Sequence, residues 1–282
     1  VSLSPKGPVD PSIRFLGEIL HDRGYVSGCV GFNPGFYRGF DIYENYHAWM
    51  AYEDAPGHKA EALNKKAIPL LESMADKPFF LFLRHMDPHS PYLPPPPFPR
   101  MFYGGNEKDP SKKSMEPVFA FKPFAEFFKS WMPPGITDAE YVVAQYDASL
   151  AYMDACIRQI LTRLEELGAA EDTLIVVTSD HGETLTEHEC YFDHHGLYEP
   201  TIHIPLIYKL PDKLPEGKRV KGFVLQQDLT PTVLDLLGYR RIAKELKMDG
   251  KSVLPLIKGK RSTNYSEFYI TECTWMRKRG WR

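Results

Sequence analysis

The apolar run TLIVVTS, residues 173–179, constrains the fold more than any other part of the chain. It follows a long amphipathic segment, 136–168, and leads directly into Asp180, His181 and Gly182. A short run in which nearly every residue is apolar is typical of a strand buried on both faces, as in parallel sheets covered by helices. We therefore predict a central strand here, with a polar loop at its carboxyl end.

Apolar runs and amphipathic segments alternate along the rest of the chain. The segment 136–168 opens with Thr137 and Glu140, spaced as a capping box, and ends at Gly168. Its apolar residues predict one buried stripe: Tyr146, Leu150, Met153, Ile157, Ile160, Leu164 and Leu167. Further helices are predicted at 10–24, 58–76, 228–238 and 251–259, and further strands at 26–32, 77–86, 204–210 and 268–272. Such alternation indicates an open α/β sheet.

The stretch 87–135 is rich in proline, lysine and phenylalanine and has no clear periodicity. A connection of this length is typical of a lid or an excursion beside an active site. A disordered insert is the alternative. Its many aromatic residues favour a packed excursion.

Composition excludes several classes of partner. The chain has 282 residues, 43% of them hydrophobic, and a formal charge of -3, so neither nucleic acid nor an anionic membrane is implied. No apolar run is long enough to span a bilayer, and the first residues lack the pattern of a signal peptide. We expect a periplasmic, secreted or lysosome-like location if a signal peptide was lost, and a cytoplasmic one otherwise. The cysteines are few and widely spaced, which suits free thiols: Cys29, Cys156, Cys190 and Cys273.

Asp180 and His181 stand at the carboxyl end of the predicted central strand. In an open α/β sheet, ligands bind beyond the carboxyl ends of the strands, where neighbouring loops converge. A carboxylate and an imidazole at that edge can bind one divalent cation. An ordinary polar turn is the alternative.

Three further histidines are candidates for chemistry on a substrate. His89 follows the strand at 77–86, which we place parallel to 173–179, so that His89 lies near Asp180. His194 and His195 precede the strand at 204–210. Imidazoles that donate protons or face an anion suit cleavage of an oxyanion ester, sulfate or phosphate, beside a metal that screens its charge. The alternative for each is a solvated loop histidine.

Two histidines receive no catalytic role. His203 falls in alternating register within TIHIPL and is predicted to be a structural residue of a sheet, and His188 is a loop residue.

The order of the motifs resembles the sulfatases of the alkaline phosphatase superfamily over nearly the whole chain, apart from the proline-rich excursion. The segments that carry it are FLGEILHDRGY, KPFFLFLRHMDPHSPY, YDASLAYMDACIRQILTRLEELG, TLIVVTSDHGE, HHGLYEPTIHIPLI, DLTPTVLDLLG and DGKSVLPLI. The resemblance implies an alkaline phosphatase-like α/β/α sandwich with a mostly parallel central sheet. It implies a single catalytic domain over 1–282, truncated at both ends, with its C-terminal subdomain largely missing.

The resemblance also assigns roles. It implies that Asp180 and His181 bind a single divalent cation, calcium first, with manganese or zinc as alternatives because of the imidazole nitrogen. His89 would contact the sulfate group. A lysine of many relatives, four residues before Tyr198, is replaced by His194, with His195 beside it, so either histidine could take that role. No other cofactor is implied.

The nucleophile of the family is a formylglycine made from a C/S-x-P-S-R motif, which this sequence does not contain. We expect the full-length protein to hydrolyse aryl or carbohydrate sulfate monoesters, and the 282-residue chain to bind metal weakly and to be inactive. A phosphonate monoester hydrolase or phosphodiesterase of the superfamily is one alternative. Two-metal members place a histidine four residues after an aspartate of the long helix, but Ala151 follows Asp147 at that spacing, which favours one metal. A degenerate, non-catalytic module is the other alternative.

Overall fold

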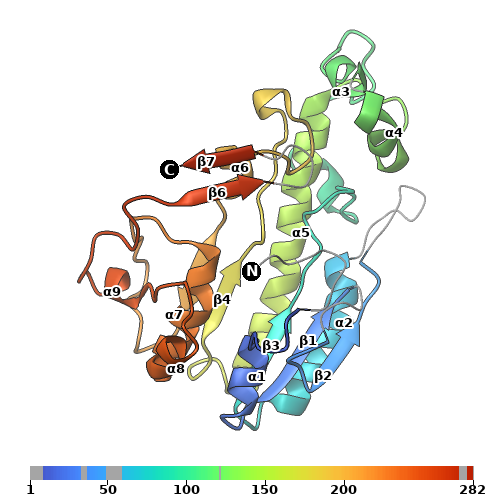
Figure 1. Ribbon diagram of the computed structural model, residues 1–282. Coiled ribbons are helices and arrows are strands. Elements are labelled where there is room, and N and C mark those ends of the chain that lie inside the picture. Colours follow the sequence, from blue (N-terminus) through green and yellow to red (C-terminus); the bar gives the residue numbers. More distant parts are fainter. Residues whose placement is uncertain (1–8, 33–36, 49–58, 121, 273–277, 282) are drawn as a thin grey trace. The chain divides into compact units, whose positions relative to one another are not determined.

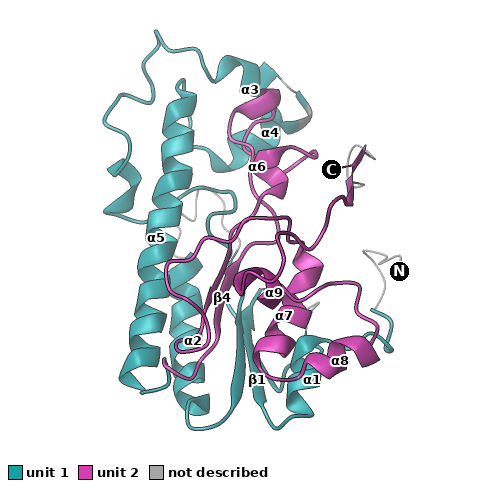
Figure 2. Cartoon of the chain, turned by 90° about the vertical axis from the view of Figure 1, so that its left-hand side faces the viewer, with its two compact units in different colours: residues 1–170 teal, residues 171–282 magenta. Residues whose placement is uncertain are grey.

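The computed structural model describes residues 9–32, 37–48, 59–120, 122–272 and 278–281. The chain divides into two compact units, residues 1–170 and 171–282 (Figure 2). The single catalytic domain expected over 1–282 stays a prediction. None of the described helices is both long and apolar enough to cross a membrane.

The first unit is built on a three-stranded parallel sheet (Figure 1). Strand β1 (Val26–Gly31) lies between β2 (Ile42–Asn45) and β3 (Phe79–Leu83), and both neighbours run parallel to it. The central strand is the buried one, with Cys29 and Val30 fully enclosed. The predicted α/β class with a parallel sheet is confirmed. The free thiols are confirmed at Cys29, Cys156 and Cys190, and Cys273 lies outside the described residues.

Helix α2 (Lys59–Met74) packs against β1 and β3, and α5 (Ala139–Glu166) packs against α2. A side chain at Gly28 of β1 would press on Leu70 and Met74 of α2, so the glycine lets helix and sheet approach closely. The first helix, α1 (Leu16–His21), is shorter than predicted. Asp10 does not cap it, because its carboxylate accepts the N–H of Ser12 in a separate turn.

Both ends of α5 have clear local causes. The N-cap is Asp138, whose side chain accepts the N–H of Glu140, so the predicted capping box beginning at Thr137 is wrong by one residue. The Thr137 hydroxyl instead donates to the carbonyl of Glu107. The predicted end is confirmed, since Gly168 takes the left-handed conformation with φ of 71°.

The buried face of α5 agrees with the predicted stripe only in part, since Ile160 and Leu164 are buried as predicted. Leu150 is 36% exposed, and the enclosed positions include Ala148, Ser149 and Tyr152. The Tyr152 hydroxyl accepts the N–H of Glu61, and small side chains allow α2 to approach. The partner helix therefore selects a face that apolarity alone does not reveal.

The excursion 87–135 is folded in its described parts, so the alternative of a disordered insert is wrong there. It contains η3 (Phe98–Arg100), α3 (Glu116–Ala120) and α4 (Lys122–Trp131), with α3 and α4 near the amino-terminal end of α5 (Figure 1). Buried Tyr92 packs edge-on against Trp131 and Tyr146, at ring-centroid distances of 5.1 and 5.3 Å. The role of this excursion as a lid stays a prediction.

The second unit contains two antiparallel strand pairs and short helices. Strand β4 (Ile175–Thr178) pairs with β5 (Leu206–Lys209), and β6 (Tyr269–Glu272) pairs with β7 (Lys278–Trp281). Among the described strands, β4 therefore pairs with β5. It does not pair with the strand at 79–83, to which we expected it to run parallel. Residues of β4 are only half-buried, so burial on both faces is also wrong.

The predicted helices of the second unit are present as α7 (Leu229–Leu236) and α9 (Leu254–Ile257), and α8 (Arg240–Glu245) lies between them in sequence. Buried Asp228 precedes α7, and its carboxylate accepts the N–H groups of Leu225 and Lys251 and the hydroxyl of Tyr265. This network ties three separate segments of the unit together.

Candidate active site

The loop after β4 is held by hydrogen bonds to its backbone. The Gln226 side chain donates to the carbonyls of Ser179 and Asp180 at 3.0 and 2.8 Å. The Gly182 N–H donates to the carbonyl of Thr201 at 2.8 Å. A Cβ at Gly182 would lie 2.0 Å from the carbonyl oxygen of Pro200, so this position requires glycine. The loop is therefore fixed on both sides of His181.

Asp180 and His181 present converging donor atoms. His181 Nδ1 lies 2.8 Å from the Gly182 carbonyl, an acceptor, so Nδ1 carries the proton and Nε2 carries the lone pair. Nε2 lies 3.7 Å from Oδ1 of Asp180, whose side chain is 81% exposed. Metal-binding histidines commonly use this arrangement, in which a backbone carbonyl orients the ring. An oxygen and a nitrogen at this separation fit one divalent cation.

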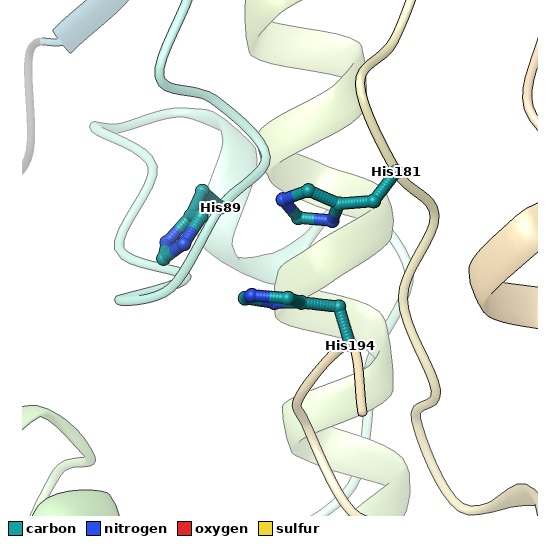
Figure 3. Close-up of side chains that lie close together, drawn as sticks. All are labelled: His89, His181 and His194. Atoms are coloured by element: carbon teal, nitrogen blue, oxygen red, sulfur yellow. The ribbon is translucent and has the colours of Figure 1, made fainter. Parts of the chain in front are cut away.

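His194 lies on His181. The two rings are stacked with centroids 3.9 Å apart and an angle of 25° between their planes (Figure 3). A bridge between Thr184 and Asp193 brings the two segments together, with N–H to carbonyl bonds of 2.8 and 3.2 Å. This local pairing across the loop therefore brings His194 beside His181.

Two carboxylates surround Nδ1 of His194. Glu183 Oε1 lies 3.6 Å away and Asp193 Oδ1 lies 3.4 Å away. Glu183 raises the pKa of His194 above its ordinary value, against the opposing effect of burial. The side chain of Glu183 is only 5% exposed, so its charge acts on the imidazole with little screening by water.

His195 has a different environment from His194. Its Nε2 lies 3.1 Å from Asp193 Oδ2, and its side chain is the more buried of the two. Both histidines thus have a ring nitrogen near Asp193, and the ring of His194 stacks on that of His181. Which of them would contact a substrate stays a prediction.

The remaining histidines have defined environments. His89 follows β3 in the first unit, and its Nδ1 lies 2.9 Å from the Ser90 carbonyl. Its expected position near Asp180 stays a prediction. His188 stacks on Tyr198 with ring centroids 4.2 Å apart. His203 is exposed at the end of α6 (Glu199–Ile202), so its predicted place in a sheet is wrong: residues before the strand form a helical turn, with Pro200 in its first positions.

Glu183 is the site residue that sequence reasoning missed. It stands three residues after Asp180 within SDHGE, so the sequence alone places it close to the two candidate metal ligands. Periodicity does not show which carboxylate of a polar loop folds inward. Its burial depends on the bridge that brings His194 over the loop.

Comparison with known proteins identifies the family. A family model described as Sulfatase matches residues 4–239. The chain belongs to the sulfatase family. The chain is 26% identical over 297 residues to the multifunctional alkaline phosphatase superfamily protein PehA of Trinickia caryophylli, covering 92% of the chain and 57% of PehA. It is 27% identical over 214 residues to Arylsulfatase K of Xenopus laevis, covering 71% of the chain and 39% of that protein.

Similarity to solved structures supports the fold of this chain. A protein solved in complex with its substrate D-glucosamine-2-N,6-O-disulfate superposes with a TM-score of 0.71 at 18% identity, covering 96% of this chain and 71% of that one. The chain therefore spans about half the length of these curated relatives and has the fold of this solved neighbour.

Proposed function

We propose that the full-length protein hydrolyses sulfate monoesters of aryl or carbohydrate alcohols, with one divalent cation held by Asp180 and His181. The observation that carries this proposal is the convergence of Asp180 Oδ1 and His181 Nε2, with the His181 ring stacked on that of His194. Support comes from the match to the sulfatase family and from Arylsulfatase K. The glucosamine disulfate bound by the solved neighbour motivates the carbohydrate class.

The donor set fits a divalent cation. One carboxylate oxygen and one imidazole nitrogen suit manganese or zinc as well as calcium, and the family resemblance favours calcium. When bound, the cation would polarise the ester and screen the charge of the sulfate group. Formylglycine in the full-length protein is the proposed nucleophile.

The histidines supply hydrogen-bond donors to the ester. His194, held between Glu183 and Asp193, would donate to a sulfate oxygen or to the leaving group. His89 is the further histidine that we propose as a donor to the sulfate group. Imidazoles with one cation suit a sulfate monoester, which carries a single negative charge, better than a phosphate dianion.

Hydrolysis of phosphonate monoesters is the second candidate. It also needs only one metal, and PehA is described as multifunctional. The same pair of residues, Asp180 and His181, would hold the cation, so the choice between the two candidates depends on measured substrate preference.

The test is a steady-state comparison of matched aryl sulfate, aryl phosphate and phosphonate monoester with the full-length protein. We expect the sulfate to have the highest kcat/KM. Asp180→Asn should lower that value by about 100-fold or more, because it removes charge next to the reacting group. Asp154→Asn, on the exposed face of α5, is the matched control and should have no effect. A clear preference for the phosphate or the phosphonate would contradict the proposal.

The 282-residue chain alone provides a second test. Asp180 and His181 supply two ligands, whereas a calcium or manganese ion takes about six or more. We expect weak or no binding in calorimetric titrations and no turnover of an aryl sulfate. Tight stoichiometric binding together with turnover would show that this chain contains a complete site.

A further inference from the structure

A buried lysine and a buried aspartate meet beneath the segment that carries His89. Lys59 is the first described residue of α2, and Asp87 lies four residues after β3. Their side chains are 2% and 3% exposed, and Lys59 Nζ lies 3.3 Å from Asp87 Oδ1. Neither residue has a role in the chemistry proposed above.

The Lys59 ammonium group has three acceptors around it. Besides Asp87, it donates to the carbonyl of His89 at 2.7 Å and to the carbonyl of Pro91 at 3.2 Å. An ammonium group has three N–H donors, so all of its hydrogen-bonding capacity is directed at the segment 87–91. The second carboxylate oxygen of Asp87 accepts the N–H of Ala60 at 2.9 Å, which ties the same segment to α2.

The segment needs a side-chain donor because its own backbone has few. Pro88 and Pro91 have no N–H group, so neither can donate to a nearby carbonyl. An unpaired carbonyl in this buried place would be destabilising, because it loses its hydrogen bonds to water without replacement. Lys59 supplies donors to two carbonyls, one of which belongs to His89 itself.

A buried ion pair is a poor means of gaining stability. Removing two charges from water is costly, and a well-packed apolar pair often stabilises a fold as well or better. Burial lowers the pKa of Lys59 and raises that of Asp87, and each partner's charge opposes that effect on the other. What an ion pair adds over an apolar pair is a defined position for the groups bonded to it.

We propose that Lys59 and Asp87 are positioning residues that hold the backbone of His89 in place for catalysis. This inference rests on the role proposed for His89. Lys59 holds the backbone carbonyl of His89, and the Ser90 carbonyl holds Nδ1 of its ring at 2.9 Å. The peptide and the ring are thus restrained separately, and Nε2 is the nitrogen that would reach an ester.

The first test measures the segment itself by hydrogen–deuterium exchange. Lys59→Met removes the ammonium group and keeps an apolar stem of similar length. We expect amide exchange within residues 86–93 to become at least tenfold faster, while exchange in β1 and α5 stays unchanged. Lys65→Met, on the same helix with a 71% exposed side chain, is the matched control and should change nothing. Unchanged exchange at 86–93 in Lys59→Met would overturn the proposal.

The second test asks whether Lys59 acts through His89. In the full-length protein, Lys59→Met should lower kcat about 10- to 100-fold with a smaller change in KM, since misplacement of a catalytic group acts mainly on the reacting state. In the His89→Ala background the same substitution should have no further effect on kcat. An equal loss in both backgrounds would indicate a merely structural role and would refute the inference.

Two controls keep the outcomes distinct. If His89→Ala leaves kcat unchanged, the role proposed for His89 fails, whereas the exchange experiment still decides whether Lys59 and Asp87 hold the segment. If Lys59→Met does not fold, Asp87→Asn replaces it, because it keeps the volume and leaves Lys59 bonded to both carbonyls. Asp87→Asn should give the same pattern with a smaller effect. Unchanged exchange at 86–93 or an unchanged kcat in this variant would overturn the proposal.

Discussion

Replacing Asp138 with alanine should destabilise the first unit by removing the centre of a buried network. Asp138 is enclosed at the start of α5 and caps the helix through the N–H of Glu140. Its carboxylate also accepts the hydroxyl of Tyr103 at 2.7 Å and the hydroxyl of Ser114 at 3.3 Å, and it pairs with Lys112. The excursion and α5 therefore share this one carboxylate.

The size of the effect follows from these contacts. Loss of an N-cap costs about 1 kcal/mol. Leaving the buried Tyr103 hydroxyl without its acceptor costs about 1–3 kcal/mol more. Lys112 is partly exposed, so its ion pair adds little. We expect Asp138→Ala to lower the free energy of unfolding by about 2–4 kcal/mol.

Urea unfolding followed by circular dichroism measures this change. Asp154→Ala is the matched control on the same helix, because the side chain of Asp154 is 72% exposed and pairs with exposed Arg158. It should change stability by less than about 0.5 kcal/mol. Equal losses for the two variants would refute the reasoning.

The pH dependence gives an independent check. Burial acts to raise the pKa of Asp138, but hydrogen bonds from Lys112 and Tyr103 outweigh it, and the net pKa is lowered. A lowered carboxyl pKa contributes stability that is complete above the unfolded value of about 4 and is lost as pH falls through the folded value. The difference between wild type and Asp138→Ala should therefore be constant from pH 5 to 7 and shrink below about pH 4. A difference that persists unchanged into stronger acid would show that the charge is not responsible.

Three further predictions concern other parts of the chain. Gly182→Ala should lower the free energy of unfolding by about 1–3 kcal/mol in urea titrations, because its Cβ would meet the Pro200 carbonyl at 2.0 Å; an unchanged midpoint would contradict the close approach. Cys190 should react with a maleimide in the native protein, whereas buried Cys29, whose pKa burial raises to about 11, should react only after unfolding. Mass spectrometry of the labelled peptides measures the order, and labelling of Cys29 before Cys190 would contradict this prediction. Asp228→Asn should lower the free energy of unfolding by about 1–3 kcal/mol, because an amide has only one acceptor oxygen for the three donors that bond to Asp228. An unchanged free energy of unfolding in urea titrations would contradict the importance of this network.

Local sequence determined the elements whose causes are local. The strands at 26–31, 79–83 and 175–178 follow from apolar runs, and α5 ends where Gly168 supplies a left-handed residue. The placement of Asp180 and His181 after a strand also follows from chain order alone. These features could be predicted because each depends on neighbours within a few residues.

Tertiary structure decided which surfaces and carboxylates became buried. Leu150 stays exposed because α2 packs against a smaller, more polar face of α5, and β4 is paired with β5. Glu183 lies beside His194 where the bridge between Thr184 and Asp193 closes the loop between them. Lys59 reaches the carbonyl of His89 across 30 residues of chain. The periodicity of a sequence indicates which positions are apolar. Whether a residue is buried and which residue it pairs with depend on the segments that pack against it in the folded chain.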